Sequence, residues 1–331
     1  MSKLALFVGI DHYESDAFEN LSCCAADAAE MERLLARHEP LAEGQTGAAN
    51  YATRLMTSDS GQRISTQSLS DNIEKLMSHS MGDGESLFYF SGHGVANRDG
   101  GYLVTQDATP ENPGYPMKDL LAAANRSANL SVVIILDCCH SGAIGNITDG
   151  EGFNQVSIGP NVTVLAGSGA TQESAEGWDH SLFTGLAIEG LTGGAADVRG
   201  EVSAAALYAY IEQSLGAWDQ RPVYKSYART LNPLRRCTPA VPDAVLARLT
   251  DWFKRPDSEF PMDPSFEVSS ESADAEKVAM FDQFKLLRNA NLLTTEKLKD
   301  LYWTALESGR VRLTPQGHLF WKRANRGEFW G

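Results

Sequence analysis

The stretch SVVIILDCCHSG, Ser131–Gly142, holds the clearest strand signal of the chain and two adjacent cysteines. Residues Ser131–Leu136 form an almost continuous apolar run, which is typical of a central parallel strand covered by helices on both faces. Asp137, Cys138 and Cys139 follow directly after this run. Ligands of parallel sheets bind in the crevice beyond the carboxyl ends of the strands. We therefore expect the functional site at this end of the strand.

A second motif, FYFSGHG at Phe88–Gly94, ends another apolar segment and places His93 in a turn bounded by glycines. A cysteine thiol needs a neighbouring base to become a thiolate, and an imidazole is such a base. If the two strands are neighbours in the sheet, both motifs point side chains into the same crevice. Because successive side chains of a strand point to opposite faces, only one of the two cysteines can face it. The two motifs together predict thiol-based nucleophilic catalysis.

The first 235 residues alternate between strand-like and helix-like segments. This order predicts an α/β fold, with a mainly parallel sheet flanked by helices on both faces. The expected strands are Lys3–Gly9, Tyr51–Met56, Ser86–Phe90, Ser131–Leu136 and Val162–Ala166. The expected helices are Ser22–His38, Thr66–Ser78, Met117–Asn125, Phe183–Leu191 and Val202–Leu215.

A domain boundary is expected near residues 233–243, which contain three prolines. We predict a first domain over residues 1–237, a linker over 238–275 and a small C-terminal α+β module over 276–331. The linker is predicted because residues 255–275 are rich in proline, serine and acids. Within the module, the pattern favours helices at Lys277–Asn289 and Thr295–Leu306, then a short strand and an apolar turn in RVRLTPQGHLFW.

The C-terminal module has two interpretations. Residues 277–331 contain 10 basic and 5 acidic residues, which suits a winged-helix-like module that binds a partner, a regulator or nucleic acid. The other interpretation is a helical lid packed on the first domain. We favour a regulatory or protein-interaction role.

The net charge of −15 is unevenly distributed along the chain. Residues 1–235 hold 14 Lys and Arg against 29 Asp and Glu, whereas residues 236–331 hold 14 of each. The acidic first part argues against nucleic-acid binding there and favours basic ligands or peptides. No apolar run approaches the roughly 18 residues of a membrane span, and the start lacks the long apolar region of a signal peptide. The five cysteines have no disulfide-framework spacing, so we expect a cytoplasmic protein without membrane contact.

The sequence resembles the caspase-like cysteine peptidases of family C14, especially the metacaspase and bacterial orthocaspase branch. SGHG followed by D-x-C-H-S-G is the signature of that family, and His93 and Cys139 are 46 residues apart, close to the separation of about 50 residues in caspases. The Q-A-C-R-G motif of true caspases is absent from the sequence. Further matching segments are GIDHY (Gly9–Tyr13), CAADA (Cys24–Ala28), AGSGATQESAE (Ala166–Glu176), HSLFTGLAIEGL (His180–Leu191) and QRPVYKS (Gln220–Ser226).

The resemblance implies a caspase-like fold and a cysteine endopeptidase with Cys139 as nucleophile and His93 as base. It also implies an oxyanion site formed by the backbone N–H groups of Gly94 and Cys139. Cys138 is then a small buried residue. By the same resemblance, Asp27 and Asp137 hold an arginine or lysine side chain of a protein substrate before the scissile bond. Two carboxylates suit a guanidinium far better than an aspartate side chain, so we expect cleavage after Arg, or Lys, and not after Asp.

The same resemblance leads to expectations about activation. No Lys or Arg occurs between Arg126 and Arg199, so an enzyme that cuts after basic residues cannot process itself there, and we predict an active single chain. The segment VANRDGGYLVTQDAT is too short and too poor in aspartate for the calcium site of calcium-dependent relatives. We expect no metal ion and no other cofactor. The resemblance also suggests a role in bacterial stress, cell death or defence.

Three alternatives stay open at this point. A related peptidase with another preference before the scissile bond is the first, and a catalytically latent caspase-like adaptor or effector module, recruited or activated by a partner, is the second. A metal site built from the cysteines is the third, although adjacent cysteines lack C-x-x-C spacing. Ser168 lacks the G-x-S-x-G context of a serine nucleophile, so we assign it, with Trp178, only to a candidate substrate groove.

Overall fold

The computed structural model describes residues 2–41, 45–79, 83–138, 157–167, 180–217, 221–230, 232–296 and 300–329. The chain forms two compact units. The N-terminal unit contains residues 1–196 and 201–238, and the C-terminal unit contains residues 197–200 and 239–331. Among the helices in the described ranges, none has the length and apolar character needed to cross a membrane.

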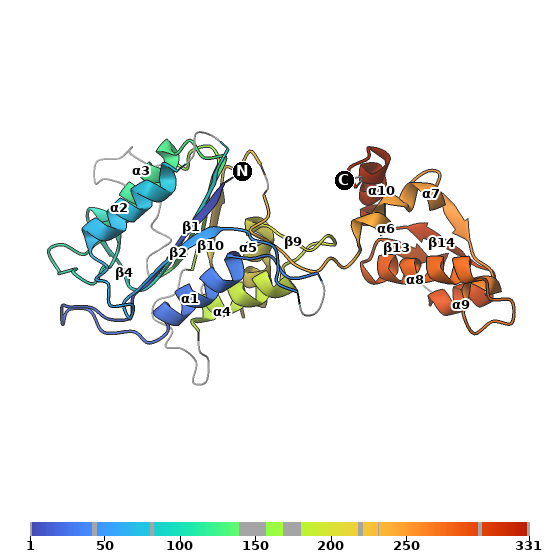
Figure 1. The fold of residues 1–331 in the computed structure, drawn as a ribbon, viewed down its shortest axis with the longest axis horizontal. Coiled ribbons are helices and arrows are strands. Elements are labelled where there is room, and N and C mark those ends of the chain that lie inside the picture. Colours follow the sequence, from blue (N-terminus) through green and yellow to red (C-terminus); the bar gives the residue numbers. More distant parts are fainter. Residues whose placement is uncertain are drawn as a thin grey trace. The chain divides into compact units, whose positions relative to one another are not determined.

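A six-stranded sheet forms the centre of the N-terminal unit (Figure 1), and its strands lie in the order β10-β8-β7-β3-β1-β2. Five strands run parallel and β10 is antiparallel to β8, so the predicted mainly parallel sheet is confirmed. The strands are β1 (Lys3–Gly9), β2 (Ala52–Thr57), β3 (Glu85–Ser91), β7 (Ser131–Asp137), β8 (Val162–Ala166) and β10 (Val223–Ser226).

Helices cover both faces of this sheet, as the apolar runs of its strands require (Figure 1). One face packs on α2 (Thr66–Met77) and α3 (Met117–Arg126). The other face packs on α1 (Cys24–Leu35), α4 (Leu182–Glu189) and α5 (Ala204–Ser214). Alternate residues of β7 divide between the two cores: Ile134 and Leu136 face α2 and α3, whereas Val133 and Ile135 face α1 and α4. A π-helical turn, η2 (Gly190–Gly194), continues α4.

Short strands complete the N-terminal unit. An antiparallel sheet follows β3 directly and consists of β4 (Gly94–Asn97), β5 (Gly100–Leu103) and β6 (Tyr115–Pro116). A two-stranded antiparallel sheet joins β9 (Glu201–Val202) and β11 (Arg235–Arg236).

The C-terminal unit has its own sheet and its own apolar core. Its three antiparallel strands lie in the order β12-β14-β13, and the helices α6 to α10 pack around them. The elements are α6 (Asp243–Ala247), α7 (Leu249–Trp252), β12 (Glu259–Pro261), the 3-10 helix η3 (Pro264–Phe266), α8 (Ala275–Asn289), β13 (Leu293–Thr295), α9 (Leu301–Leu306), β14 (Arg310–Leu313) and α10 (Pro315–Asn325).

Three details of the C-terminal unit differ from the sequence-based expectation. The helix expected over Thr295–Leu306 is the shorter α9, Leu301–Leu306, and Thr295 belongs to the strand β13. Residues 238–275 are not a linker, because Leu246, Phe253 and Phe266 in this range are buried in the core of the unit. The linker was predicted from the proline and acid content of this range. Its few apolar residues did not alter that prediction, although they pack in the core. The expected apolar turn after β14 is the helix α10, capped by Thr314 with Pro315 at its first position.

Candidate active site

The two motifs lie at the ends of neighbouring strands. β3 pairs with β7 in parallel, and Ser91 is opposite Asp137 in their register. β1 lies on the other side of β3, with Gly9 opposite Ser91. The condition for a shared crevice beyond the carboxyl ends of the strands is therefore met. Cys139, Ser168 and Trp178 lie outside the described residues.

Strand alternation fixes the direction of the residue before Cys139. Cys138 is 6% exposed and belongs to the core on the α2 and α3 side, together with Ile134 and Leu136. The expectation that Cys138 is a small buried residue is confirmed. Asp137 has the opposite parity and faces the α1 and α4 side, where its carboxylate contacts Thr184.

His93 is oriented by contacts at both its ring and its backbone. Its Nε2 lies 2.8 Å from the backbone oxygen of Glu19. A carbonyl oxygen only accepts hydrogen bonds, so Nε2 carries the proton and a neutral ring has its lone pair on Nδ1. The backbone N–H of His93 donates to Tyr13 Oη at 2.9 Å, and Tyr13 Oη donates to the oxygen of Ile10 at 3.0 Å. The rings of Tyr13 and His93 also pack together, with centroids 5.0 Å apart.

The segment that supplies Tyr13 and Glu19 is itself held in place by Asp11. This buried carboxylate accepts from the backbone N–H groups of Cys24 at 2.8 Å and Ala25 at 2.9 Å. It therefore caps the start of α1 and ties the end of β1 to that helix. Sequence reasoning missed the roles of Asp11, Tyr13 and Glu19. GIDHY was visible as a family landmark, but the contribution of Glu19 is a backbone oxygen, which no side-chain pattern reveals.

Gly92 makes room for the Tyr13 contact. A Cβ at Gly92 would lie 3.0 Å from the Phe90 ring and 3.1 Å from Tyr13 Oη. Such distances are closer than ordinary packing allows, so a larger residue would push on the tyrosine that positions His93. Gly94, the next glycine, is buried and begins β4.

The two predicted acids lie close to each other in a buried site behind this loop. Asp27, on α1, is completely buried; its Oδ2 accepts from Ser91 Oγ at 3.1 Å and its Oδ1 is 2.8 Å from His180 Nδ1. The Oδ2 of Asp137 accepts from Thr184 Oγ1 at 2.5 Å and from Ser181 Oγ. Burial, followed by the charge of Asp137, raises the pKa of Asp27 to about 6. Burial also raises the pKa of Asp137.

The start of α4 holds Asp137 in this position. Ser181 caps the helix by accepting from Thr184 N at 3.1 Å, and Tyr89 Oη lies 2.6 Å from Thr184 Oγ1. Because Thr184 Oγ1 donates its hydrogen to Asp137, Tyr89 is the donor in the second contact. Sequence reasoning missed His180, Ser181 and Thr184 as partners of the acids, although HSLFT was one of the matching segments.

The caspase-domain model of peptidase family C14 matches residues 2–231. The chain belongs to this family. Family C14 is a family of cysteine peptidases, which are hydrolases that act on proteins. Among solved structures, the caspase domain is similar to protein GSU0716 from Geobacter sulfurreducens, at 19% identity and a TM-score of 0.50, over 72% of this chain and 98% of that chain.

A second solved structure, pro-Sf-caspase-1, matches at 11% identity with a TM-score of 0.43, over 71% of this chain and 91% of that chain. No curated protein gives a significant match to the sequence.

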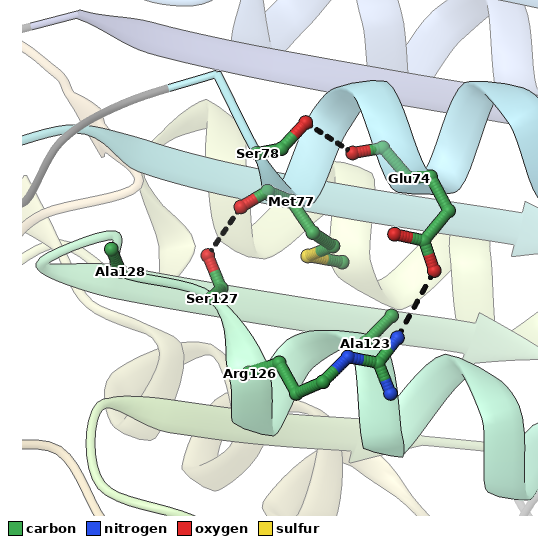
Figure 2. Close-up of a pocket in the computed structure, with 7 residues that line it drawn as sticks. All are labelled: Glu74, Met77, Ser78, Ala123, Arg126, Ser127 and Ala128. Atoms are coloured by element: carbon green, nitrogen blue, oxygen red, sulfur yellow. Dashed lines mark hydrogen bonds and ion pairs between the residues drawn. The ribbon is translucent and has the colours of Figure 1, made fainter.

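A cavity of about 240 Å³ in the caspase domain lies away from this site (Figure 2). It is at the C-terminal ends of α2 and α3, which precede the amino ends of β3 and β7. Glu74 pairs with Arg126 there at 3.1 Å, and Ser127 Oγ donates to the oxygen of Met77 at 2.6 Å. With His93 and both acids at the opposite ends of the strands, this cavity is not part of the candidate active site.

Proposed function

We propose that this caspase domain is an endopeptidase that cleaves after arginine, and less efficiently after lysine, with Cys139 as nucleophile and His93 as base. The observation that carries the proposal is the fixed orientation of His93. The Nε2–H of His93 donates to the Glu19 oxygen. His93 follows β3, which pairs with β7, and Cys139 follows β7 in the chain. A nucleophile, a base and a third group that orients the base make up the constellation of covalent catalysis.

In the proposed reaction, Nδ1 of His93 accepts the thiol proton of Cys139. The thiolate attacks the carbonyl carbon of the scissile bond, and the oxyanion accepts hydrogen bonds from the backbone N–H groups of Gly94 and Cys139. The His93 imidazolium then protonates the leaving amine as the C–N bond breaks. Water, deprotonated by His93, hydrolyses the thioester and releases the acid and the free thiol.

Asp27 and Asp137 support the preference for a basic residue. Their carboxylates share one buried site beside Ser91, whereas a site for an aspartate side chain requires cationic groups. Burial raises the pKa of both groups, which makes their negative charge unfavourable in the free protein. A bound cation would relieve that cost, which favours arginine over neutral or acidic side chains.

The remaining expectations belong to the same proposal. Residues 127–198 contain no Lys or Arg, so the enzyme acts as a single chain without internal processing. It requires neither calcium nor another cofactor. The C-terminal unit regulates the protease or binds a partner, in a cytoplasmic stress, cell-death or defence response.

The test is a peptide-cleavage assay on the full chain with matched peptides that carry Arg, Lys, Asp or Asn before the scissile bond. We expect cleavage after Arg and Lys only, and no cleavage by Cys139→Ala or His93→Ala. Equal activity of wild type and Cys139→Ala on every peptide would refute the proposal and favour the adaptor role. An obligatory cut within residues 143–198, seen by mass spectrometry of an active preparation, would refute the single-chain part alone.

A further inference from the structure

The carboxylate of Asp27 cannot be reached from solvent in the free protein. Its side chain has no exposed surface, and each of its oxygens already has a partner. Ser91, the partner of Oδ2, is itself buried. His180, the partner of Oδ1, is 26% exposed. The imidazole of His180 therefore covers the side of Asp27 from which a cationic group would approach.

Asp137 differs from Asp27 in how its charge is stabilised. Two hydroxyls at the start of α4, from Ser181 and Thr184, donate to it, and the amino end of a helix favours negative charge. Asp137 is partly exposed as a residue, while its carboxylate lies in the buried site that it shares with Asp27. Asp137 is thus held by two hydroxyl donors of the scaffold, whereas one oxygen of Asp27 is bound by the imidazole of His180.

We propose that His180 is a substrate-site residue that occupies Asp27 in the free enzyme and is displaced by the guanidinium of the substrate. This inference rests on the proposed cleavage after arginine. The imidazole holds the place of the substrate cation, and its rotation away from Asp27 Oδ1 opens the second carboxylate.

The charges around His180 fit a site that receives a cation. Glu30 on α1 is paired with Arg33, which leaves Asp27, in contact with His180, and Asp137 on β7 as the acidic groups of this site. These acidic groups attract any cation that replaces the imidazole. Asp27 keeps a partner in both states, so its buried charge is never left uncompensated.

Displacement of His180 also separates arginine from lysine. A guanidinium presents a planar fork of donors and can bind Asp27 and Asp137 at the same time. An ammonium is a compact point charge with a smaller reach. The cost of breaking the Asp27–His180 contact is the same for both cations and is recovered more fully by arginine, so arginine displaces His180 more completely than lysine does.

The test compares steady-state kinetics of the full-length wild type, His180→Ala and His180→Asn on matched Arg and Lys peptides. The amide nitrogen of asparagine can take the position of Nδ1 and keep the contact with Asp27. We expect His180→Ala to lower KM for the Arg peptide about tenfold with kcat unchanged, and to lower KM for the Lys peptide by no more than the same factor. His180→Asn should stay within about twofold of wild type, as should the control His318→Ala in the C-terminal unit.

A binding measurement separates this inference from the proposed catalysis. Benzamidine, titrated calorimetrically into the Cys139→Ala protein, should bind about tenfold more tightly when His180→Ala is added. A higher KM and weaker benzamidine binding in His180→Ala would overturn the inference, because His180 would then be positioning Asp27 for the substrate. Unchanged values would overturn it as well. If wild type cleaves no basic peptide but the benzamidine result holds, the proposed function fails and the exchange at Asp27 stands.

Discussion

Replacing Asp27 by asparagine is expected to stabilise the N-terminal unit at neutral pH while it removes cleavage after arginine. Burial, together with the charge of Asp137, raises the pKa of Asp27 from 3.8 to about 6. A carboxyl group that holds its proton more tightly in the native state than in the unfolded state loses stability as pH rises through the interval between the two values. The native protein is therefore less stable above pH 6 than below pH 4 on account of Asp27, and asparagine has no such dependence.

The shift from 3.8 to about 6 sets the size of the effect. At about 1.4 kcal/mol per pH unit, the full interval corresponds to about 3 kcal/mol. Between pH 4.5 and pH 8 the wild type loses about 2 kcal/mol of its free energy of unfolding on account of Asp27. The remainder is lost below pH 4.5, where the interval between the two pKa values begins. The substitution also weakens hydrogen bonds such as that from Ser91, and this loss lowers the free energy of unfolding by the same amount at both pH values. It therefore cancels when the stability differences at the two pH values are subtracted.

The assay is urea denaturation of wild type and Asp27→Asn at both pH values, with brief proteolysis and mass spectrometry to follow the N-terminal unit separately from the C-terminal unit. The free energy of unfolding of Asp27→Asn, relative to wild type, should increase by about 2 kcal/mol from pH 4.5 to pH 8. The exposed Asp119, changed to asparagine, serves as the control and should show no such increase. A relative stability that is constant or falls with pH would show that Asp27 carries no unfavourable buried charge, and the account of the acid pair would be wrong.

Three further predictions concern the geometry around this site and the C-terminal unit. Tyr13→Phe should lower kcat by about threefold to tenfold with little change in KM. It keeps the ring but removes a hydrogen bond to the His93 backbone that is worth about 0.5–1.5 kcal/mol. A change confined to KM would contradict a positioning role. Cys138→Ala should retain peptidase activity that Cys139→Ala abolishes, and the reverse result in a peptide assay would show that strand alternation has been misassigned. Leu246→Ala should destabilise the C-terminal unit by about 2–5 kcal/mol in the same denaturation assay, whereas an exposed linker residue would leave stability unchanged.

The fold of the N-terminal unit could be predicted because its signals are local and consistent. The apolar run Ser131–Leu136 predicted a strand with helices on both faces, and this strand lies in the centre of the sheet. The C-terminal unit was predicted less well. Its core depends on apolar residues such as Phe253 and Phe266, which stand in short elements between prolines and acids. Segments of this length carry too little periodicity to distinguish a core element from a linker.

The sequence by itself determined which residues stand at the ends of the strands. Asp137 ends its strand, His93 and Cys139 follow theirs in the chain, and the parity of a strand separates Cys138 from its neighbours. These properties depend on covalent order and on the two-residue repeat of an extended chain, so they are readable without coordinates.

Only the tertiary structure decided what those residues contact. The Glu19 oxygen meets His93, and His180 meets Asp27 across 153 residues of sequence. Such contacts arise when the ends of separate elements converge on one edge of a sheet. Their partners include a backbone carbonyl and a side chain that resembles any surface histidine in the sequence. The orientation of the base and the occupation of the acid pair are therefore products of packing, because no local pattern encodes a contact between segments so far apart.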